Sequence, residues 1–374
     1  MDHNTAPHSS PSSRSRRSAP RPRLTVTSPP DLVAAVAVAL GFVPTESVVM
    51  LVLAPASGPH ARIDLPYPRE GEEGVRSVAR VLAAAGIRNH VDQVALVVFA
   101  EHHRAMSIAP GLATTMAAAG IEVTAFLGAD GASCLEFVPS TGEVRGRDRG
   151  GSDLVTQPYE VLAHPFVARA VADGLPVRRD RSELEEMIAP QGDAVSRVAS
   201  HTCPRCLRAQ QSGPGPSDAE RIRGWTRRGA RFPSTRDEHL VACLLKVLDD
   251  AARAGDSDVR DATWSWVHRS EAARHVDLWV AVVRAAPVGR AVQAASVLAF
   301  HAWLAGQGAL AWCALDRVAE RGGSSSLATL VRDLMERSVP PHSWDPLTAV
   351  EVVSDAGAST SVVPLRGATT TPPV

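Results

Sequence analysis

Lysine, aromatic residues and the common catalytic motifs are scarce or absent in this chain of 374 residues. Lys246 is its one lysine, and aromatic residues make up 4% of the sequence. There is no phosphate loop ending in Lys-Ser or Lys-Thr, no GxGxxG after a strand, no HExxH and no GxSxG. These absences exclude the enzyme classes that such motifs mark. The sequence therefore favours a protein that is not an enzyme, although a catalyst without a common motif stays open.

Neither the hydrophobic pattern nor the charge directs the chain to a membrane. The apolar run at residues 32–43 is shorter than the ~20 residues that a spanning helix needs. A formal net charge of −1 gives no overall field that would attract a membrane or nucleic acid. The five cysteines are odd in number and scattered, unlike the framework of a small secreted protein. We expect a cytoplasmic protein with no membrane partner.

Changes in composition divide the chain into five segments. Residues 1–22 are rich in Ser, Pro and Arg, which predicts a disordered basic arm. Residues 23–190 alternate between strand and helix patterns, and residues 191–216 are a Gly- and Pro-rich linker that contains a CxxC. Residues 217–340 carry helical patterns alone, and residues 341–374 form a loose tail.

The segment 23–190 predicts an α/β domain. Short β-branched and apolar runs predict strands, and longer amphipathic segments predict helices between them. The expected strands are 24–27, 47–53, 61–65, 93–100, 121–127 and 134–138; the expected helices are 32–40, 75–85, 105–119, 159–172 and 181–188. Strands separated by single helices indicate a mixed-sheet sandwich with crossover helices.

The segment 217–340 predicts an all-α bundle of helical hairpins. Gly- or Pro-marked connections separate its helices, which favours antiparallel neighbours. The expected helices are 217–228, 236–254, 257–268, 270–285, 289–305, 308–321 and 325–337. Gly306, Ala311 and Leu315 have the spacing of a tetratricopeptide-like hairpin, so we expect such a unit at the end of the bundle.

Two segments resemble one family. Residues 28–53 (SPPDLVAAVAVALGFVPTESVVMLVL) match its opening motif, and residues 297–334 (VLAFHAWLAGQGALAWCALDRVAERGGSSSLATLVRDL) match its helical closing motif. The chain resembles the actinobacterial domain-of-unknown-function 4192 family. The resemblance implies a fold and an actinobacterial host, but no reaction.

A possible metal site combines a CxxC with two helical residues. Cys203-Pro-Arg-Cys206 places two thiols in one turn, and His239 and Cys243 are four residues apart on an expected helix, hence on one face. These four residues predict a zinc site, with His201 as a competing ligand. Two alternatives are a plain linker CxxC with a buried Cys243, and redox chemistry of the CxxC. We expect no other cofactor.

Arginine is concentrated between Arg197 and Arg236. This stretch holds nine arginines against Asp218 and Glu220, with Trp225 among them. Arginines hold phosphates and an aromatic ring can stack a base, so the pattern is compatible with nucleic-acid binding. A solvated helix face in an arginine-rich protein explains the same residues.

Polar residues at expected strand ends are the candidates for catalysis. They are Glu46, Asp64, Glu101 and His102. Ligands of open α/β sheets bind at the carboxyl ends of strands, and Glu101 with His102 supplies a carboxylate beside an imidazole. A helix start would explain Glu101 equally well, because a carboxylate there is favoured by the helix dipole.

These observations lead to three hypotheses about function. The first is a protein-interaction or regulatory module that binds a protein partner through a tryptophan-edged apolar groove in the helical half. The second is an enzyme or small-ligand sensor with a pocket at the strand ends. The third is an arginine-rich, zinc-linked nucleic-acid binder.

Overall fold

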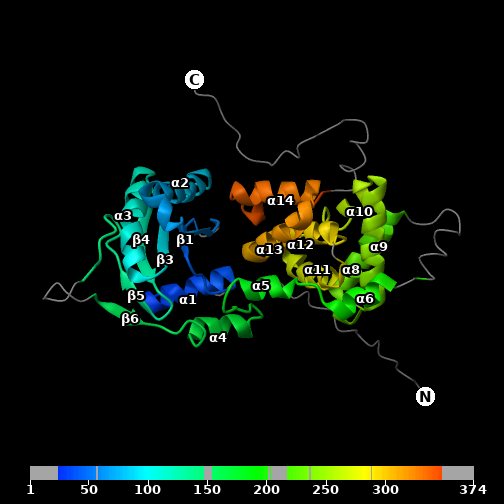
Figure 1. Cartoon of the computed structure of the whole chain (residues 1–374), viewed down its shortest axis with the longest axis horizontal. Coiled ribbons are helices and arrows are strands. Elements are labelled where there is room, and N and C mark those ends of the chain that lie inside the picture. The colour runs from blue at the N-terminus through cyan, green and yellow to red at the C-terminus, as the bar shows by residue number, and fades with distance from the viewer. Residues whose placement is uncertain are drawn as a thin grey trace, which may run out of the picture.

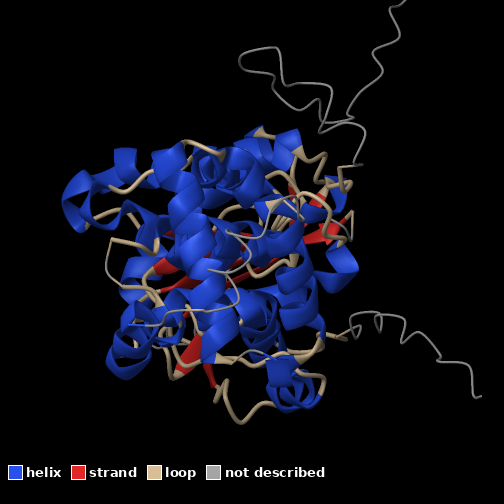
Figure 2. Cartoon of the chain, turned by 90° about the vertical axis from the view of Figure 1, so that its right-hand side faces the viewer, coloured by secondary structure: helices blue, strands red, loops and turns tan. Residues whose placement is uncertain are grey.

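A computed structural model describes residues 24–55, 58–146, 154–200, 203, 217–235, 237–287 and 289–347. The sheet and its helices lie at one end, and the later helices lie at the other (Figure 1). Seen from the helical end, helices face the viewer and strands are visible between them (Figure 2). Among the described residues, no helix is both long and apolar enough to cross a bilayer.

Six strands form one mixed sheet. They are β1 (Ser47–Ala54), β2 (Ala61–Asp64), β3 (Gln93–Phe99), β4 (Glu122–Ala129), β5 (Ser133–Glu136) and β6 (Thr156–Pro158), in the order β2-β1-β3-β4-β5-β6. The β3–β4 pair is parallel and the other pairs are antiparallel. Helix α3 (His102–Ala118) connects the parallel strands, so it is the crossover helix. The predicted mixed sheet is confirmed.

The central strands are buried on both faces. Along β3, Val94, Leu96 and Val98 face one core and Ala95, Val97 and Phe99 face another. Helices α2 (Gly71–Arg88) and α3 cover the first face, and α1 (Pro29–Leu40) and α4 (Pro165–Ala172) cover the second. Because successive side chains of β3 enter the two cores in turn, every position from Val94 to Phe99 is buried, and this part of the strand is one continuous apolar run. The result is a three-layer α/β sandwich.

The remaining helices pack around a second core. They are α5 (Ser182–Met187), α6 (Gly192–Ser200), α8 (Asp218–Arg231), α9 (Glu238–Ala254), α10 (Ser257–Asp261), α11 (Ala272–Ala285), α12 (Val292–Leu304), α13 (Gly308–Ala319) and α14 (Ser326–Glu336). Short 3₁₀ turns occur at Pro68–Glu70, Pro233–Thr235, Arg269–Glu271, Glu320–Gly322 and Pro341–Ser343. Helix α12 is buried on all sides and contacts α9, α11, α13 and α14.

The two halves meet through α5. Leu184 and Ile188 lie in the same core as the helical half, and Phe42, which follows α1, joins them. Arg181 extends across to α13, where its guanidinium pairs with Asp316 at 2.7 Å. The end of the predicted α/β segment therefore packs on the helical half.

Several predicted elements differ from the structure. Leu24–Thr27 is irregular rather than a strand, because the backbone N–H of Thr27 bonds the Asp31 side chain instead of a sheet neighbour. Strand β6 was not predicted, and residues 159–164 lie outside α4. Helix α6 occupies part of the expected linker, and helix 257–268 ends at Asp261. The basic arm 1–22 and most of the tail lie outside the described residues.

The other expected helices are confirmed in place. Helices α12 and α13 are antiparallel neighbours around Gly306, which has a φ of 76°. The likeness of this hairpin to a tetratricopeptide unit stays a prediction.

Replacing Gly142 by alanine should destabilise the α/β half more than the same change at Gly131. Both glycines have positive φ, 72° and 98°. A Cβ at position 142 would lie 2.4 Å from the carbonyl carbon of Ala109 in α3, whereas nothing lies within 4 Å at position 131. We expect G131A to cost about 1–2 kcal/mol from backbone strain and G142A about 2 kcal/mol more from the clash. Urea unfolding measures both, and equal losses would contradict this packing.

The start of α1 should make stability depend on pH in the acid range. Hydrogen bonds from the side chain and backbone of Thr27, opposed by burial and aided by Ser28 and His164, lower the pKa of Asp31 from 3.8 to about 2. A lowered folded-state pKa means that the stabilisation is present above the unfolded pKa of 3.8 and is lost as pH falls toward about 2. D31N should therefore lower Tm at neutral pH and flatten its fall across this window. T27V should reproduce part of the effect, because it removes one hydrogen bond to Asp31. If Tm of D31N falls with pH as steeply as Tm of the wild-type protein, this account of Asp31 is wrong.

Candidate metal centre and arginine cleft

The structure places Glu46 and Asp64 in ion pairs with arginines. Glu46, just before β1, pairs with Arg104 of α3. Asp64, at the end of β2, is 2.7 Å from Arg62, and 71% of its side chain is exposed. Each carboxylate is thus balanced by its own cation near the surface. This arrangement is that of a rim of ion pairs, and a catalytic role of the two carboxylates stays a prediction.

Glu101 and His102 do not form the expected acid–base pair. Glu101 is exposed and its carboxylate lies 3.3 Å from the ring of His103. The His102 ring is largely buried, with Nε2 2.9 Å from Ser133 Oγ and 3.2 Å from the Asp130 carboxylate. The partner of His102 is therefore Asp130, in the turn between β4 and β5.

Asp130, Ser133 and His102 lack the geometry of a catalytic triad. Such a triad uses both ring nitrogens, one toward serine and one toward aspartate. Here Nε2 makes both contacts, and the buried Nδ1 has no hydrogen-bond partner among the described residues. Burial would raise the pKa of Asp130, but the backbone N–H groups of Ser133 and Ala132 and the His102 ring together lower it. The three residues hold a turn.

Three of the four predicted metal ligands converge. Cys203 Sγ lies 3.5 Å and Cys243 Sγ 3.8 Å from His239 Nε2, and the three ligand atoms are within 4.8 Å of one another. Both cysteines are buried and His239 is half-buried. Cys206 and the competing His201 lie outside the described residues.

The start of α9 positions two of these side chains. Asp237 precedes the helix, and its carboxylate accepts the Leu240 N–H at 2.8 Å, which fixes the first turn. His239 and Cys243 then fall on one face, one turn apart. Cys203 follows α6, which packs against α9.

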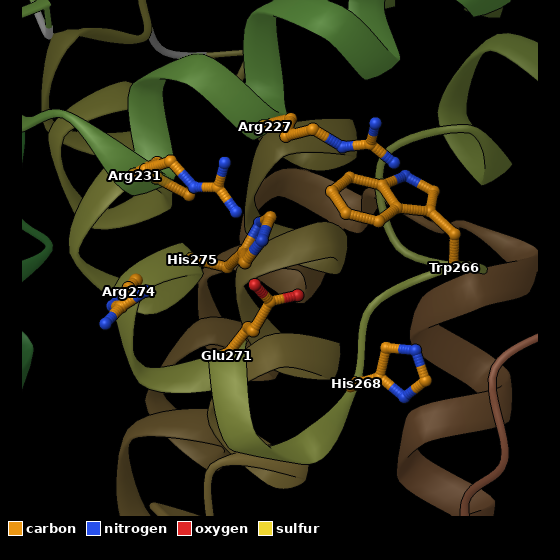
Figure 3. Close-up of a pocket in the computed structure, with 8 residues that line it drawn as sticks. Arg227, Arg231, Trp266, His268, Glu271, Arg274 and His275 are labelled. Atoms are coloured by element: carbon orange, nitrogen blue, oxygen red, sulfur yellow. The ribbon is translucent and has the colours of Figure 1, made fainter. Parts of the chain in front are cut away.

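A second site, which we call the arginine cleft, opens between α8 and the start of α11. It is a surface cleft of about 290 Å³. Its lining residues are mostly cationic or aromatic: Arg227, Ala230, Arg231, Trp266, His268, Glu271, Arg274 and His275. The Arg231 side chain and the Glu271 carboxylate extend toward the middle of the cleft, and Arg227 runs along the Trp266 ring (Figure 3).

Aromatic contacts fix the wall of the arginine cleft. The Arg227 guanidinium lies 4.7 Å from the centre of the Trp266 ring, and the Trp266 indole N–H donates to the carbonyl of Ala262 at 2.8 Å. The rings of Trp266 and His275 pack edge to face with their centroids 5.4 Å apart, and His275 stacks on His301 of α12 with a centroid distance of 4.9 Å. The cleft is thereby connected to the helical core.

The buried end of this stack is uncharged. Complete burial, with a smaller effect from His275, places the pKa of His301 well below its usual value. Its Nδ1 lies 2.8 Å from the carbonyl of Val297 and donates to it in the neutral ring. A neutral His301 contributes no charge, and the lining of the cleft includes three arginines and one glutamate.

Sequence reasoning identified part of this cleft. Arg227 and Arg231 lie within the arginine-rich stretch, but the aromatic residue beside them is Trp266 and not Trp225, which packs against the helical core. Asp130 and Ser133 were also missed. The only sequence signal for them is the Asp-Gly turn at residues 130–131.

One family model, described as a domain of unknown function (DUF4192), matches residues 29–342. The chain belongs to this family. The match covers both halves of the molecule, including the converging thiols and the arginine cleft. The comparison with curated proteins and the comparison with solved structures gave no match.

Proposed function

We propose that the protein is a regulatory ligand-binding protein whose helical half holds a phosphate group in the arginine cleft. The observation that carries the proposal is the meeting of Arg227, Arg231 and Arg274 around one cleft, although the whole chain has a net charge of −1. A local excess of positive charge attracts an anion whatever the net charge of the protein.

Phosphate is an anion that these residues are suited to bind. Guanidinium groups are planar, always charged, and bind phosphate oxygens through paired N–H donors. Within the part of the chain that the structure describes, Arg231 and Glu271 form no ion pair with protein groups. The Arg231 donors therefore lack a competing carboxylate, and Glu271 can accept a hydrogen bond from a ligand hydroxyl.

The size and the aromatic wall favour a nucleotide unit. A volume near 290 Å³ is at the lower end of ligand pockets, which hold about 300–1,000 Å³. Bases stack on arginine planes and on aromatic rings, and Arg227 over Trp266 offers such a surface. The unit is either a free nucleotide or part of a single-stranded nucleic acid. The single-stranded case corresponds to the nucleic-acid hypothesis for the stretch from Arg197 to Arg236.

The other hypotheses rank lower. A protein partner in a tryptophan-edged apolar groove stays a prediction; the described cleft is polar, and Trp264, Trp279 and Trp303 are buried. A catalytic pocket at the strand ends is less favoured because Glu46 and Asp64 are in ion pairs and Glu101 is exposed. We also propose an actinobacterial host and a cytoplasmic location, on the arginine bias and the cysteine pattern.

Removing arginines of the cleft should weaken binding of phosphate-bearing probes. Calorimetric titration would use inorganic phosphate, a mononucleotide and a single-stranded oligonucleotide. R231A and R274A should each reduce affinity about 10–100-fold, because each loses charge-assisted hydrogen bonds worth about 1.5–3 kcal/mol. Arg223, on the same helix but outside the cleft, provides the matched control R223A.

The three probes separate the two sources of phosphate. A free nucleotide should bind with weak dependence on salt, whereas a strand should bind more tightly and lose affinity steeply as salt rises. Absence of binding by all three probes at millimolar concentration would contradict the proposal. Equal losses of affinity in R223A and R231A would indicate binding to a diffuse basic surface and not to the cleft.

A further inference from the structure

We infer that Cys203, His239 and Cys243 bind a zinc ion and supply three of its four ligands. The inference does not rest on the proposed function, since the residues, the ion and the measurement are all different. It starts from the convergence of two buried sulfurs on one imidazole nitrogen, Nε2 of His239.

The distances match the edges of a tetrahedral site. With Zn–S of about 2.3 Å and Zn–N of about 2.0–2.1 Å, a tetrahedron places sulfur and nitrogen about 3.6 Å apart. The two observed sulfur–nitrogen distances are 3.5 and 3.8 Å. The two sulfurs lie within 4.8 Å of each other, and a tetrahedral ion would hold them about 3.8 Å apart. An ion at the centre would thus leave the sulfur–nitrogen distances nearly unchanged.

Hydrogen bonding alone accounts for these contacts less well. One imidazole nitrogen carries either a proton or a lone pair, so it makes a single good hydrogen bond. Two sulfurs nevertheless approach the same Nε2. A metal ion between the three atoms satisfies both sulfurs and the nitrogen together.

The donor set suits zinc and does not suit magnesium or calcium. Thiolate and imidazole are ligands of zinc, whereas magnesium and calcium require oxygen. Two thiolates balance the charge of a divalent ion, which matters because Cys203 and Cys243 are only 5% and 4% exposed. A buried centre held by thiolates and an imidazole is typical of a structural zinc site.

Such a centre would join two separate segments of the chain. Cys203 follows α6, and His239 and Cys243 belong to the first two turns of α9. Helix α9 in turn packs against α8, which carries Arg227 and Arg231. The metal would therefore fix the start of α9 beside the helix that forms one wall of the arginine cleft.

Metal analysis of the full-length chain tests this inference. Purified wild-type protein, or protein refolded with zinc, should contain about one equivalent. C203S, C243S and H239A should each lose most of it, whereas H239C should retain zinc because a thiolate can replace the imidazole. The matched control is C134S, which alters a buried cysteine of β5 outside this group.

Zinc K-edge absorption of the wild-type protein gives a result that does not depend on whether the variants fold. At least two sulfurs at about 2.3 Å and one imidazole nitrogen should surround the ion. A wild-type protein that takes up no zinc would overturn the inference, as would a first shell with fewer than two sulfurs. Loss of zinc in C134S equal to that in C203S would do the same. Failure of the zinc inference would leave the phosphate proposal standing, because that proposal is tested by separate substitutions at the arginines.

Discussion

The helical half depends on burying α12 on every side. Each residue from Ala294 to Leu304 is buried, including two polar ones. Burial of a polar group costs free energy unless a hydrogen bond replaces its contact with water. The hydroxyl of Ser296 donates to the carbonyl of Val292 at 2.7 Å, and His301 bonds Val297 one turn away. Both use carbonyls of their own helix, whereas the Trp303 indole N–H donates to the carbonyl of Val339 at 3.1 Å, and His301 Nε2 has no hydrogen-bond partner among the described residues. The surfaces that enclose α12 are otherwise mainly apolar.

This enclosed helix also determines the position of the arginine cleft. His301 stacks on His275, His275 packs edge to face with Trp266, and Trp266 supports the guanidinium of Arg227. Contacts thus run from the core to a surface cation. An arginine held in this way loses less side-chain freedom on binding an anion than a solvated one. The rigidity of α12 is therefore part of what makes the cleft a suitable binding site.

Sequence patterns within one helix or strand predicted that element correctly, but they did not predict which elements lie side by side. The apolar runs of β1 and β3 predicted buried strands because both faces of the sheet are covered. The four-residue spacing of His239 and Cys243 placed both on one helical face. Strand β6, a three-residue Thr-Gln-Pro edge, carries no such pattern. Trp266 and Arg274 join Arg231 through folding of segments about 40 residues apart, which no local spacing encodes.

The two sites lie on consecutive helices but differ in electrostatic character. Helix α8 ends at Arg231 in the arginine cleft, and α9 begins at Glu238, one residue before the first helical ligand of the inferred metal. The three inferred ligands, two thiolates and a neutral imidazole, balance the charge of one divalent zinc ion, and a third thiolate as the fourth ligand would make the centre negative. With a neutral fourth ligand, the metal would position α9 without adding to the field of the arginines at long range. Attraction of an anion would come from Arg227, Arg231 and Arg274, and the metal would act on binding only through the placement of the helices.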